Sequence, residues 1–465
     1  MINFTNKKHG TKPVKGGVVF VLFGATGDLV RRKLIPAIYD LYSEKKINKF
    51  KIIGVARKSF TPEKLIENSQ KYIPKYDKKI LRDIEKNTSY IRMDFSDSEK
   101  YHLLEQELNI LNKNGYGLKL FHLSTMSENF EVISENLKKI NVIDKNSRVL
   151  YEKPFGNNLK SSLKINKKII KTFGESNIYR VDHFLGKELV EGIVFTRFSN
   201  EIFEPLWNNK HVKSMQFLLD EDINLKNKGA FFEKYGVVKD VVQNHLLQLV
   251  ALVGMEKPKL ISGKYIQKEK EKLLKKIKIK DSIFAQYSGY RTEKNINKKS
   301  RVETFAALKL EINNKRWKGV PIYIKTGKNL SKKNTKIIIE FKKPQCLLIK
   351  GGEVESNYLE IRIWPNPGMS IYLNEKTPGS NNIEPIKLDF CYDCAFGSNT
   401  SKGYKDVYLK AIQGDHSLSI SFSEIKNSWK IIENLDRDKL YFYNPGSEGP
   451  KELFKFNKKH NINWR

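Results

Sequence analysis

The chain has few cysteines and no long apolar run. Three cysteines among 465 residues exclude a scaffold held together by several disulfides and are typical of a reducing compartment. No stretch approaches the roughly 18 consecutive apolar residues of a membrane span, and the basic residues 1–15 lack the apolar segment of a signal peptide. We therefore expect a cytoplasmic protein with no membrane partner.

Acidic side chains are scarce relative to basic ones. The chain carries 85 lysines and arginines against 52 aspartates and glutamates, a net charge of +33. A basic stripe would indicate nucleic acid, but the lysines here are spread along the whole sequence. We therefore expect no nucleic-acid partner, and a general attraction for phosphorylated ligands instead. The hydrophobic fraction of 39% excludes a disordered chain.

The sequence also lacks internal repeats and the Pro, Gly or Ser tracts that mark linkers. At about 150 residues per domain, its length gives three domains or two larger ones. In the first part, apolar runs alternate with helical patterns, which predicts a parallel sheet with right-handed crossovers. The predicted strands are Val18–Phe23, Lys51–Ala56, Leu118–Leu123 and Arg148–Tyr151, and the predicted helices include Leu29–Tyr42 and Glu131–Ile140.

The pattern changes after Asp182. An apolar helix is predicted over Val241–Val253, and the Lys-rich segment Gln267–Asp281 is expected to form a solvated helix and a surface loop. Runs of strands with few helices between them favour a mixed or antiparallel sheet. These predicted strands are Phe305–Ile312, Val320–Lys325, Lys336–Phe341, Tyr358–Trp364 and Leu418–Phe422.

These patterns predict two domains. Residues 1–182 form an α/β, Rossmann-like dinucleotide-binding domain, with residues 1–16 as a loose basic N-terminus. Residues 183–465 form a larger α+β domain with a mostly antiparallel sheet, which we expect to bind the substrate and to mediate oligomerisation.

A glycine-containing turn follows the first predicted strand. Val18–Phe23 runs into Gly24-Ala25-Thr26-Gly27-Asp28-Leu29, and a helical pattern begins at once. This arrangement points backbone N–H groups and a helix N-terminus at a pyrophosphate. The full GxGxxG spacing is absent because Val30 occupies the third glycine position, so a plain strand-to-helix turn is the alternative.

The end of the second strand bears on the choice of coenzyme. Arg57 and Lys58 stand where sites specific for NAD place a carboxylate that binds the ribose hydroxyls. Two cations would attract a 2′-phosphate, so we predict NADP, with NAD as the alternative. Lys58 alone is equally consistent with a solvated side chain.

Three further motifs occur in a fixed order along the chain. They are Tyr151-Glu152-Lys153-Pro154-Phe155-Gly156, Arg180-Val181-Asp182-His183-Phe184-Leu185-Gly186-Lys187-Glu188 and Lys239-Asp240-Val241-Val242-Gln243-Asn244-His245. Together with the glycine turn they resemble the glucose-6-phosphate dehydrogenase family over nearly the whole chain. The resemblance implies oxidation of glucose 6-phosphate to 6-phosphogluconolactone, the first step of the oxidative pentose phosphate pathway, and a homodimer or homotetramer.

The resemblance assigns a role to each candidate residue. Oxidation of a hemiacetal needs a base, usually histidine, and a carboxylate that orients it. His245 resembles the family's base and Asp182 its partner; the alternative for an isolated His245 is a structural histidine in an apolar helix. By the same resemblance, the substrate is bound by Lys153, His183, Lys187, Glu221, Asp240, Lys328 and Lys333. The coenzyme is bound by Gly24, Ala25, Thr26, Gly27, Asp28, Leu29, Arg57, Met93, Asp94 and Lys153.

The sequence departs from the family pattern at several positions. Phe184 replaces a tyrosine, which removes one hydroxyl donor to the phosphate, and Trp364 replaces a glutamine often found near the sugar. Pro154 matches a proline that is cis in the family. Cys391 and Cys394 resemble half of a zinc site, but a structural zinc needs four ligands, so we predict no metal and expect a surface loop there.

Overall fold

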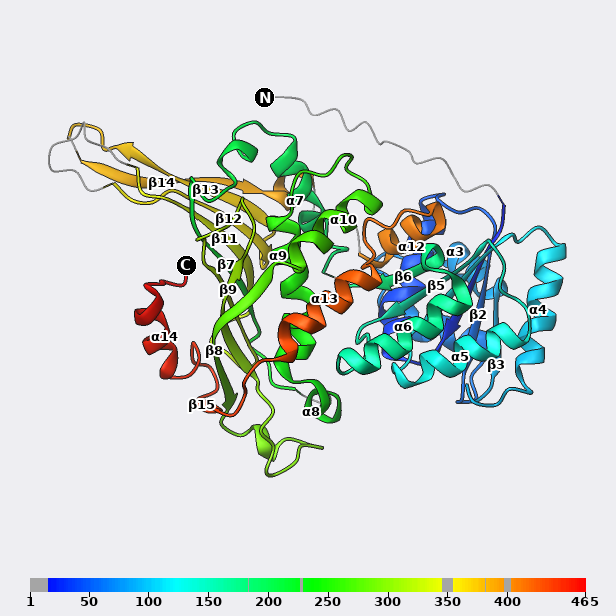
Figure 1. The fold of residues 1–465 in the computed structure, drawn as a ribbon. Coiled ribbons are helices and arrows are strands. Elements are labelled where there is room, and N and C mark those ends of the chain that lie inside the picture. Colours follow the sequence, from blue (N-terminus) through cyan, green and yellow to red (C-terminus); the bar gives the residue numbers. More distant parts are fainter. Residues whose placement is uncertain (1–15, 183, 226–228, 345–353, 381, 397–402) are drawn as a thin grey trace. The chain divides into compact units, whose positions relative to one another are not determined.

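The computed structural model describes residues 16–182, 184–225, 229–344, 354–380, 382–396 and 403–465. They form two compact units (Figure 1). Among the described residues, the first comprises 16–156, 163–182, 184–186 and 403–420, and the second comprises 157–162, 187–225, 229–344, 354–380, 382–396 and 421–465. The predicted boundary after residue 182 stays a prediction. The later residues 403–420 cluster with the first unit.

The first unit is built on a six-stranded parallel sheet of order β3-β2-β1-β4-β5-β6. This order reverses between β1 and β4, as in dinucleotide-binding folds, and the predicted parallel sheet is confirmed. The strands are β1 (Val18–Phe23), β2 (Phe50–Ala56), β3 (Thr88–Arg92), β4 (Leu118–Leu123), β5 (Ser147–Glu152) and β6 (Ile178–Val181).

Helices cover both faces of this sheet, which is why β1 is apolar at every position. The helices are α1 (Ile35–Ser43), α2 (Pro62–Gln70), α3 (Lys78–Lys86), α4 (Tyr101–Lys113), α5 (Glu128–Lys139), α6 (Leu159–Phe173) and α12 (Tyr404–Gln413). On one face Phe20 of β1 packs edge-on against Tyr408 of α12, with ring centroids 5.1 Å apart. On the other face Phe23 packs against Tyr101 of α4.

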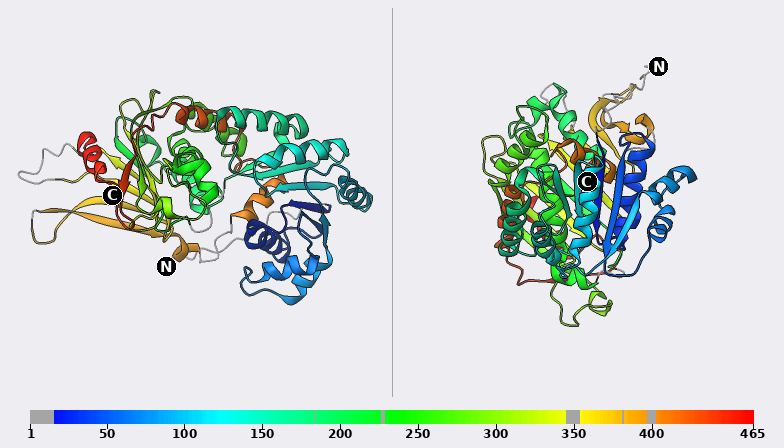
Figure 2. Two further views of the ribbon diagram at one scale, coloured as in Figure 1. Left: turned by 90° about the horizontal axis from the view of Figure 1, so that it is seen from below. Right: turned by 90° about the vertical axis from the view of Figure 1, so that its right-hand side faces the viewer.

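The second unit contains a nine-stranded sheet of order β14-β13-β12-β11-β7-β10-β9-β8-β15. Only the pairs β7–β10 and β8–β15 are parallel, so the predicted mostly antiparallel sheet is confirmed. The strands are β7 (Val212–Asp220), β8 (Ile277–Tyr287), β9 (Phe305–Ile312), β10 (Ile322–Gly327), β11 (Asn334–Phe341), β12 (Tyr358–Trp364), β13 (Gly368–Lys376), β14 (Ile383–Cys391) and β15 (Tyr441–Tyr443). The β13–β14 hairpin extends beyond the neighbouring strands (Figures 1 and 2).

The helices of the second unit pack on each other and on this sheet. They are α7 (Glu188–Phe198), α8 (Gly229–Val237), α9 (Leu247–Gly254), α10 (Gly263–Leu274), α11 (Tyr392–Phe396), α13 (Phe422–Glu433) and α14 (Glu452–His460). A π-helical segment, η4 (Val238–Leu246), runs directly into α9. Together η4 and α9 contain the predicted apolar helix. No helix in the described part of the chain is long and apolar enough to cross a membrane.

Three sequence-based expectations are wrong in whole or in part. Cys391 and Cys394 do not lie on a surface loop, because β14 ends at Cys391 and α11 contains Cys394. Leu418–Phe422 is no strand: Leu418 and Ile420 are buried in the connection between α12 and α13, and Phe422 begins α13. The segment Gln267–Asp281 is helical up to Leu274, in α10, as expected, but its second half begins β8 in place of a surface loop. Lys270 is 1% exposed and pairs with the buried Glu424 at 2.6 Å.

Candidate functional site

The glycine turn closes directly on the neighbouring strands of the first unit. The N–H groups of Gly24 and Ala25 donate to the Val55 carbonyl, at 2.8 and 3.2 Å. Gly24 has a φ of +82°, and a Cβ on it would lie 2.5 Å from the Ser124 carbonyl oxygen. Only glycine fits there, so the chain can turn tightly enough for the backbone to approach a phosphate.

The residues after Gly24 line the start of the first helical segment. Ala25 is buried, whereas Thr26, Gly27 and Leu29 are partly exposed around the turn. The π-helical segment η1 (Val30–Leu34) then leads into α1.

Asp28 is exposed at the same turn and is paired with its own helix. Its carboxylate accepts from Arg31 at 2.5 Å and from Arg32 at 3.4 Å. The hydrogen bond from Arg31 lowers the pKa of Asp28. Because these arginines balance the carboxylate, the turn remains suitable for a pyrophosphate group despite its acidic residue.

The ends of β2 and β3 form a basic edge. Arg57 and Lys58 are both exposed, and Arg92 Nε donates to the Arg57 carbonyl at 3.3 Å. Sequence reasoning missed Arg92, although its place at the end of the third strand marked it as a neighbour of Arg57.

The two other residues predicted at this edge differ in exposure. Met93 is buried, and the exposed Asp94 accepts from the Ser96 backbone and hydroxyl. Those bonds, with a smaller contribution from Arg57, lower the pKa of Asp94. The basic edge therefore holds three cations, Arg57, Lys58 and Arg92, and the carboxylate of Asp94.

Lys153 follows β5 on a segment that a buried network supports. The preceding residue, Glu152, lies 3.3 Å from His122 Nε2, and His122 Nδ1 lies 3.0 Å from the Tyr408 hydroxyl. Tyr408 comes from residues 402–420, far away in sequence, and so could not be linked to Lys153 by any local motif. The Lys153–Pro154 bond is cis, as the family resemblance implies.

Asp182 directly follows β6 and is buried, with an exposed fraction of 1%. Its Oδ1 accepts from the Phe184 backbone N–H at 2.9 Å. Phe184 is 9% exposed, so its ring is largely buried. His183 lies outside the described residues.

Arg180 ties β6 to its surroundings just before Asp182. Its guanidinium donates to Tyr151 and Asn166, at 2.9 and 2.7 Å, and pairs with Glu175. This buried network fixes the strand end from which Asp182 projects.

In the second unit, Asp240 and His245 lie on η4. His245 is 3% exposed and Asp240 is half-buried. π-Helical segments inside helices are frequent at functional sites because they change the direction in which side chains project. The structure thus brings these two predicted residues onto one short element.

Glu303 supports the start of η4 and was not predicted. Its Oε1 accepts from the Val238 N–H at 3.3 Å, and its backbone carbonyl accepts from Val237 N–H at 3.0 Å. Arg437 pairs with the carboxylate at 3.6 Å. Burial raises the pKa of Glu303. The signal available in the sequence was its position just before β9 in an otherwise apolar run.

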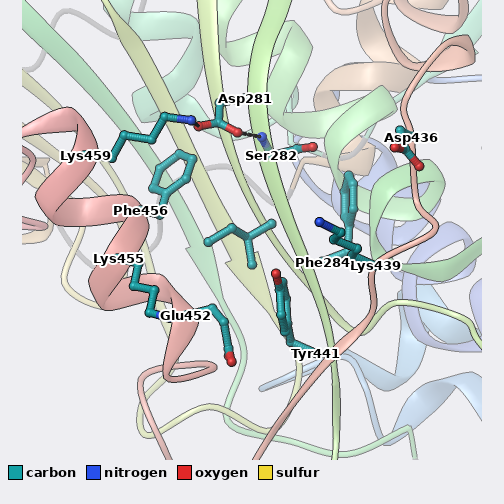
Figure 3. A pocket seen from close by; sticks show the side chains of 11 residues that line it. Asp281, Ser282, Phe284, Asp436, Lys439, Tyr441, Glu452, Lys455, Phe456 and Lys459 are labelled. Carbon is teal, nitrogen blue, oxygen red and sulfur yellow. Dashed lines mark hydrogen bonds and ion pairs between the residues drawn. The ribbon is translucent and has the colours of Figure 1, made fainter.

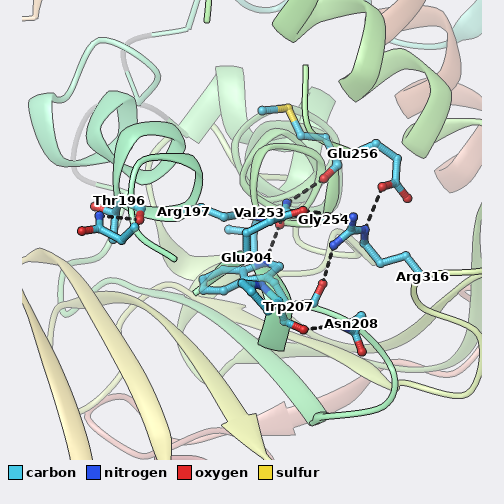
Figure 4. Close-up of polar contacts among 12 residues, drawn as sticks. Thr196, Arg197, Glu204, Trp207, Asn208, Val253, Gly254, Glu256 and Arg316 are labelled. Carbon is cyan, nitrogen blue, oxygen red and sulfur yellow. Dashed lines mark hydrogen bonds and ion pairs between the residues drawn. The ribbon is translucent and has the colours of Figure 1, made fainter. Parts of the chain in front are cut away.

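The far end of the same helix is anchored by Arg197 (Figure 4). Arg197 Nη1 donates to the carbonyls of Val253 and Met255, at 2.9 and 2.6 Å, while its Nε donates to Glu204 at 2.7 Å. Trp207 Nε1 also donates to the Val253 carbonyl. Carbonyls at a helix C-terminus have no partner within the helix, so this cluster satisfies them and fixes α9.

Two predicted substrate residues form an ion pair in the second unit. Lys328 Nζ bonds the Glu221 carboxylate at the end of β7, and the neighbouring Lys325 pairs with the buried Asp220 at 3.2 Å. Burial raises the pKa of Asp220 to about 6. Adjacent parallel strands β7 and β10 end here together, which is why these residues meet.

The other predicted lysines of this unit are placed separately. Lys187 is half-buried at the start of α7. Lys333 is exposed, with its Nζ 4.9 Å from the ring centre of Trp364. The Lys333 ammonium group therefore makes a cation–π contact with the Trp364 ring. Because Asp182 belongs to the first unit and His245 to the second, a hydrogen bond between them stays a prediction.

A separate cavity of about 500 Å³ lies beside β8 and α14 (Figure 3). Ile283, Phe284 and Phe456 provide apolar lining, and Lys459 at its rim pairs with Asp281 at 2.7 Å. None of the predicted site residues lines it. Its charged residues are of both signs and indicate no particular ligand.

Comparisons with known proteins identify both units. Residues 21–192 match the model of the glucose-6-phosphate dehydrogenase NAD-binding domain, and residues 194–465 match that of the glucose-6-phosphate dehydrogenase C-terminal domain. The chain is 38% identical to the glucose-6-phosphate 1-dehydrogenase of Chlamydia pneumoniae, over 96% of each chain. It is 35% identical to that of Bacillus subtilis, over 96% of this chain and 98% of the relative.

Solved structures agree. A glucose-6-phosphate dehydrogenase in complex with its substrate glucose 6-phosphate superposes with a TM-score of 0.91 at 29% identity, covering 98% of this chain and 100% of the other. The enzyme from Mycobacterium avium gives 0.86 at 29% identity, covering 98% and 99%. The glycine turn, the cationic edge, the π-helical segment with His245 and these matches along the whole length show that the chain belongs to the glucose-6-phosphate dehydrogenase family.

Proposed function

We propose that this chain oxidises glucose 6-phosphate at its anomeric carbon, transfers the hydride to NADP and releases 6-phosphogluconolactone. The observation that carries the proposal is the buried His245, which lies with Asp240 on the helical segment η4. The relatives of this chain are named for the same activity. His245 takes the proton of the anomeric hydroxyl. Asp182 orients the imidazole and stabilises its charged form. His183 and Lys187 bind the phosphate, and Lys153 contacts both the coenzyme and the sugar. The sugar is also bound by Glu221, Asp240, Lys328 and Lys333.

The residues of the first unit fit the coenzyme. At Gly24 a Cβ would collide with the Ser124 carbonyl, so glycine is needed for the tight turn by which the backbone can approach a pyrophosphate. When bound, the nicotinamide supplies the acceptor for the hydride. The chain's own residues orient the sugar and remove its proton.

The test of the base is His245→Asn. Loss of a positioned general base lowers kcat roughly 10²–10⁴-fold, while binding of glucose 6-phosphate is retained, because asparagine keeps a similar polar shape. The exposed His211 provides the control: His211→Asn keeps the wild-type kcat. A His245→Asn enzyme with more than about a tenth of the wild-type kcat would show that another group is the base.

The choice of NADP rests on the basic edge of Arg57, Lys58 and Arg92. A guanidinium can bond a 2′-phosphate with two parallel hydrogen bonds. Arg57→Ala should weaken NADP by about 10- to 150-fold, since a charge-assisted bond contributes about 1.5–3 kcal/mol, and leave NAD unchanged. Lys58→Ala is the matched control and should change the affinities for NADP and NAD less than Arg57→Ala does. Equal losses of affinity for both coenzymes would instead make Arg57 a structural residue or a contact to the pyrophosphate.

We also propose that the protein is a homodimer or homotetramer that associates through the β13–β14 hairpin. Ile386, Leu388 and Phe390 alternate along β14 and are 38%, 53% and 37% exposed. Exposed apolar side chains along an edge strand favour association with a second copy. Leu388→Asp should convert the oligomer to monomer in sedimentation velocity, whereas the exposed Leu260→Asp should not. A wild-type chain that sediments as a monomer would contradict the proposal.

A further inference from the structure

Cys391 and Cys394 form a disulfide, where the sequence predicted only a surface loop. Their Cα atoms are 5.2 Å apart, and only two residues separate them in the chain. Cys391 is the last residue of β14 and stands opposite Gly368 of β13. Cys394 lies in α11, the short helix that follows at once.

This disulfide connects nothing that is distant in sequence. A cross-link that closes so short a loop removes little entropy from the unfolded chain. The neighbouring residues are already held by the ladder between β13 and β14 and by the Tyr392 N–H, which donates to the Pro367 carbonyl at 3.0 Å. Stabilisation of the fold therefore does not account for the pair.

Metal binding does not account for it either. A structural zinc site takes four ligands, usually cysteines and histidines. In the described ranges, no group of three or more His, Cys, Asp or Glu side chains is arranged to hold a metal ion. The two sulfurs thus lack the companions that a metal would need among those residues.

The two sulfurs differ in their surroundings. Cys394 is exposed, whereas Cys391 is half-buried, and Cys391 Sγ accepts from the Cys394 backbone N–H at 3.1 Å. An exposed sulfur is open to attack by an incoming thiolate. A sulfur that accepts an N–H bond is stabilised as a thiolate and is the better leaving group.

We propose that Cys391 and Cys394 form a redox-active site that exchanges with thiols and disulfides of low molecular weight, such as glutathione. In the reducing direction, a thiolate attacks Cys394 Sγ, the bond between the two sulfurs breaks, and its electron pair stays on Cys391 Sγ. A second thiolate then attacks the external sulfur of the mixed disulfide and releases the Cys394 thiolate. The protein gains two electrons and two protons, and two external thiols become one disulfide.

The experiment uses the full-length chain with Cys346→Ser, so that the pair holds the only thiols. The reduced protein is treated with oxidised glutathione, quenched, and labelled with iodoacetamide before mass spectrometry of the intact chain. We expect two labels before oxidation and none after it, with the mass of the oxidised chain lower by two hydrogens. Two labels after oxidation, or stable glutathione adducts in place of the internal bond, would overturn the proposal.

A second measurement identifies the attacked sulfur. The oxidised Cys346→Ser chain is mixed with reduced glutathione and quenched with acid, and the mixed disulfide is located by peptide mass spectrometry. Glutathione should be on Cys394, and glutathione on Cys391 would contradict the assigned order.

A third measurement separates redox chemistry from a structural role. Cys391→Ser and Cys394→Ser are added together to the Cys346→Ser chain. This variant should unfold at the same temperature as the oxidised Cys346→Ser chain. A large fall of that temperature would show that the disulfide is a structural cross-link and would overturn the proposal.

Discussion

Gly236→Ala tests how the fold supports the helix that carries His245. Gly236 lies in α8, immediately before η4, with φ of +60° and ψ of 177°. Residues other than glycine essentially never adopt this backbone conformation, and forcing one into it costs about 1–3 kcal/mol. A Cβ there would also lie 2.6 Å from Oε1 of the buried Glu303.

The collision adds a second cost. Glu303 cannot retreat without giving up its bond to the Val238 N–H, and an unsatisfied buried donor costs about 1–3 kcal/mol. Gly236→Ala should therefore lose about 2–6 kcal/mol of unfolding free energy. Because η4 begins at Val238, kcat should fall as well.

The assay is urea unfolding followed by fluorescence, with kcat measured on the same samples. Gly289→Ala is the matched control, since Gly289 also has a positive φ, of +92°, but no atom within 4 Å of an added Cβ. It should lose only about 1–2 kcal/mol. In a Glu303→Ala background the collision is absent, so Gly236→Ala should cost about 1–3 kcal/mol less than in the wild type. Equal losses in both backgrounds would refute the role assigned to Glu303.

Two further predictions concern buried charges. Arg197→Met removes the side-chain donor to the Met255 carbonyl, while Glu204 keeps Arg316 and the Val253 carbonyl keeps Trp207 as partners. It should therefore destabilise the protein by about 1–3 kcal/mol in urea unfolding, and a smaller loss than that of the more exposed Arg316→Met would contradict this role for Arg197. Burial raises the pKa of Asp220 from 3.8 to about 6, so protonation of this carboxyl favours the folded state. Its contribution to the free energy of unfolding amounts to about 3 kcal/mol. It is complete below about pH 4 and is lost as the pH rises through about 6. Asp220→Asn should therefore flatten the fall of stability between these pH values, and an unchanged pH profile would show that Asp220 is ionised throughout.

The sequence was informative where one local pattern decides the structure. Val18–Phe23 is apolar at every position because both faces of its sheet are covered, and the predicted strand has these bounds. The turn at Gly24 was predictable because the backbone conformation itself requires glycine. The family motifs predicted the candidate residues, including Asp240 and His245 on one helical segment.

The sequence misled where tertiary contacts outweigh the local pattern. Leu418–Phe422 is as apolar as a strand, yet it is buried as a connection because residues 402–420 pack on the first unit. Lys270 looked solvated within its Lys-rich segment, but its Nζ is buried against Glu424 and Gln248. A lysine is nearly always exposed unless such partners exist, and these partners come from other helices.

What the sequence by itself determined is therefore the class of each sheet, several of its strands, the glycine turn and the family. Tertiary structure alone decided which groups support the candidate residues. Glu303 at the start of η4, Arg197 at the end of α9 and Tyr408 beside His122 all come from segments far from the residue that they support. The physical reason is that periodicity and turn chemistry act over a few neighbouring residues, whereas the hydrogen bonds of a buried charge depend on whatever the completed fold brings within about 3 Å.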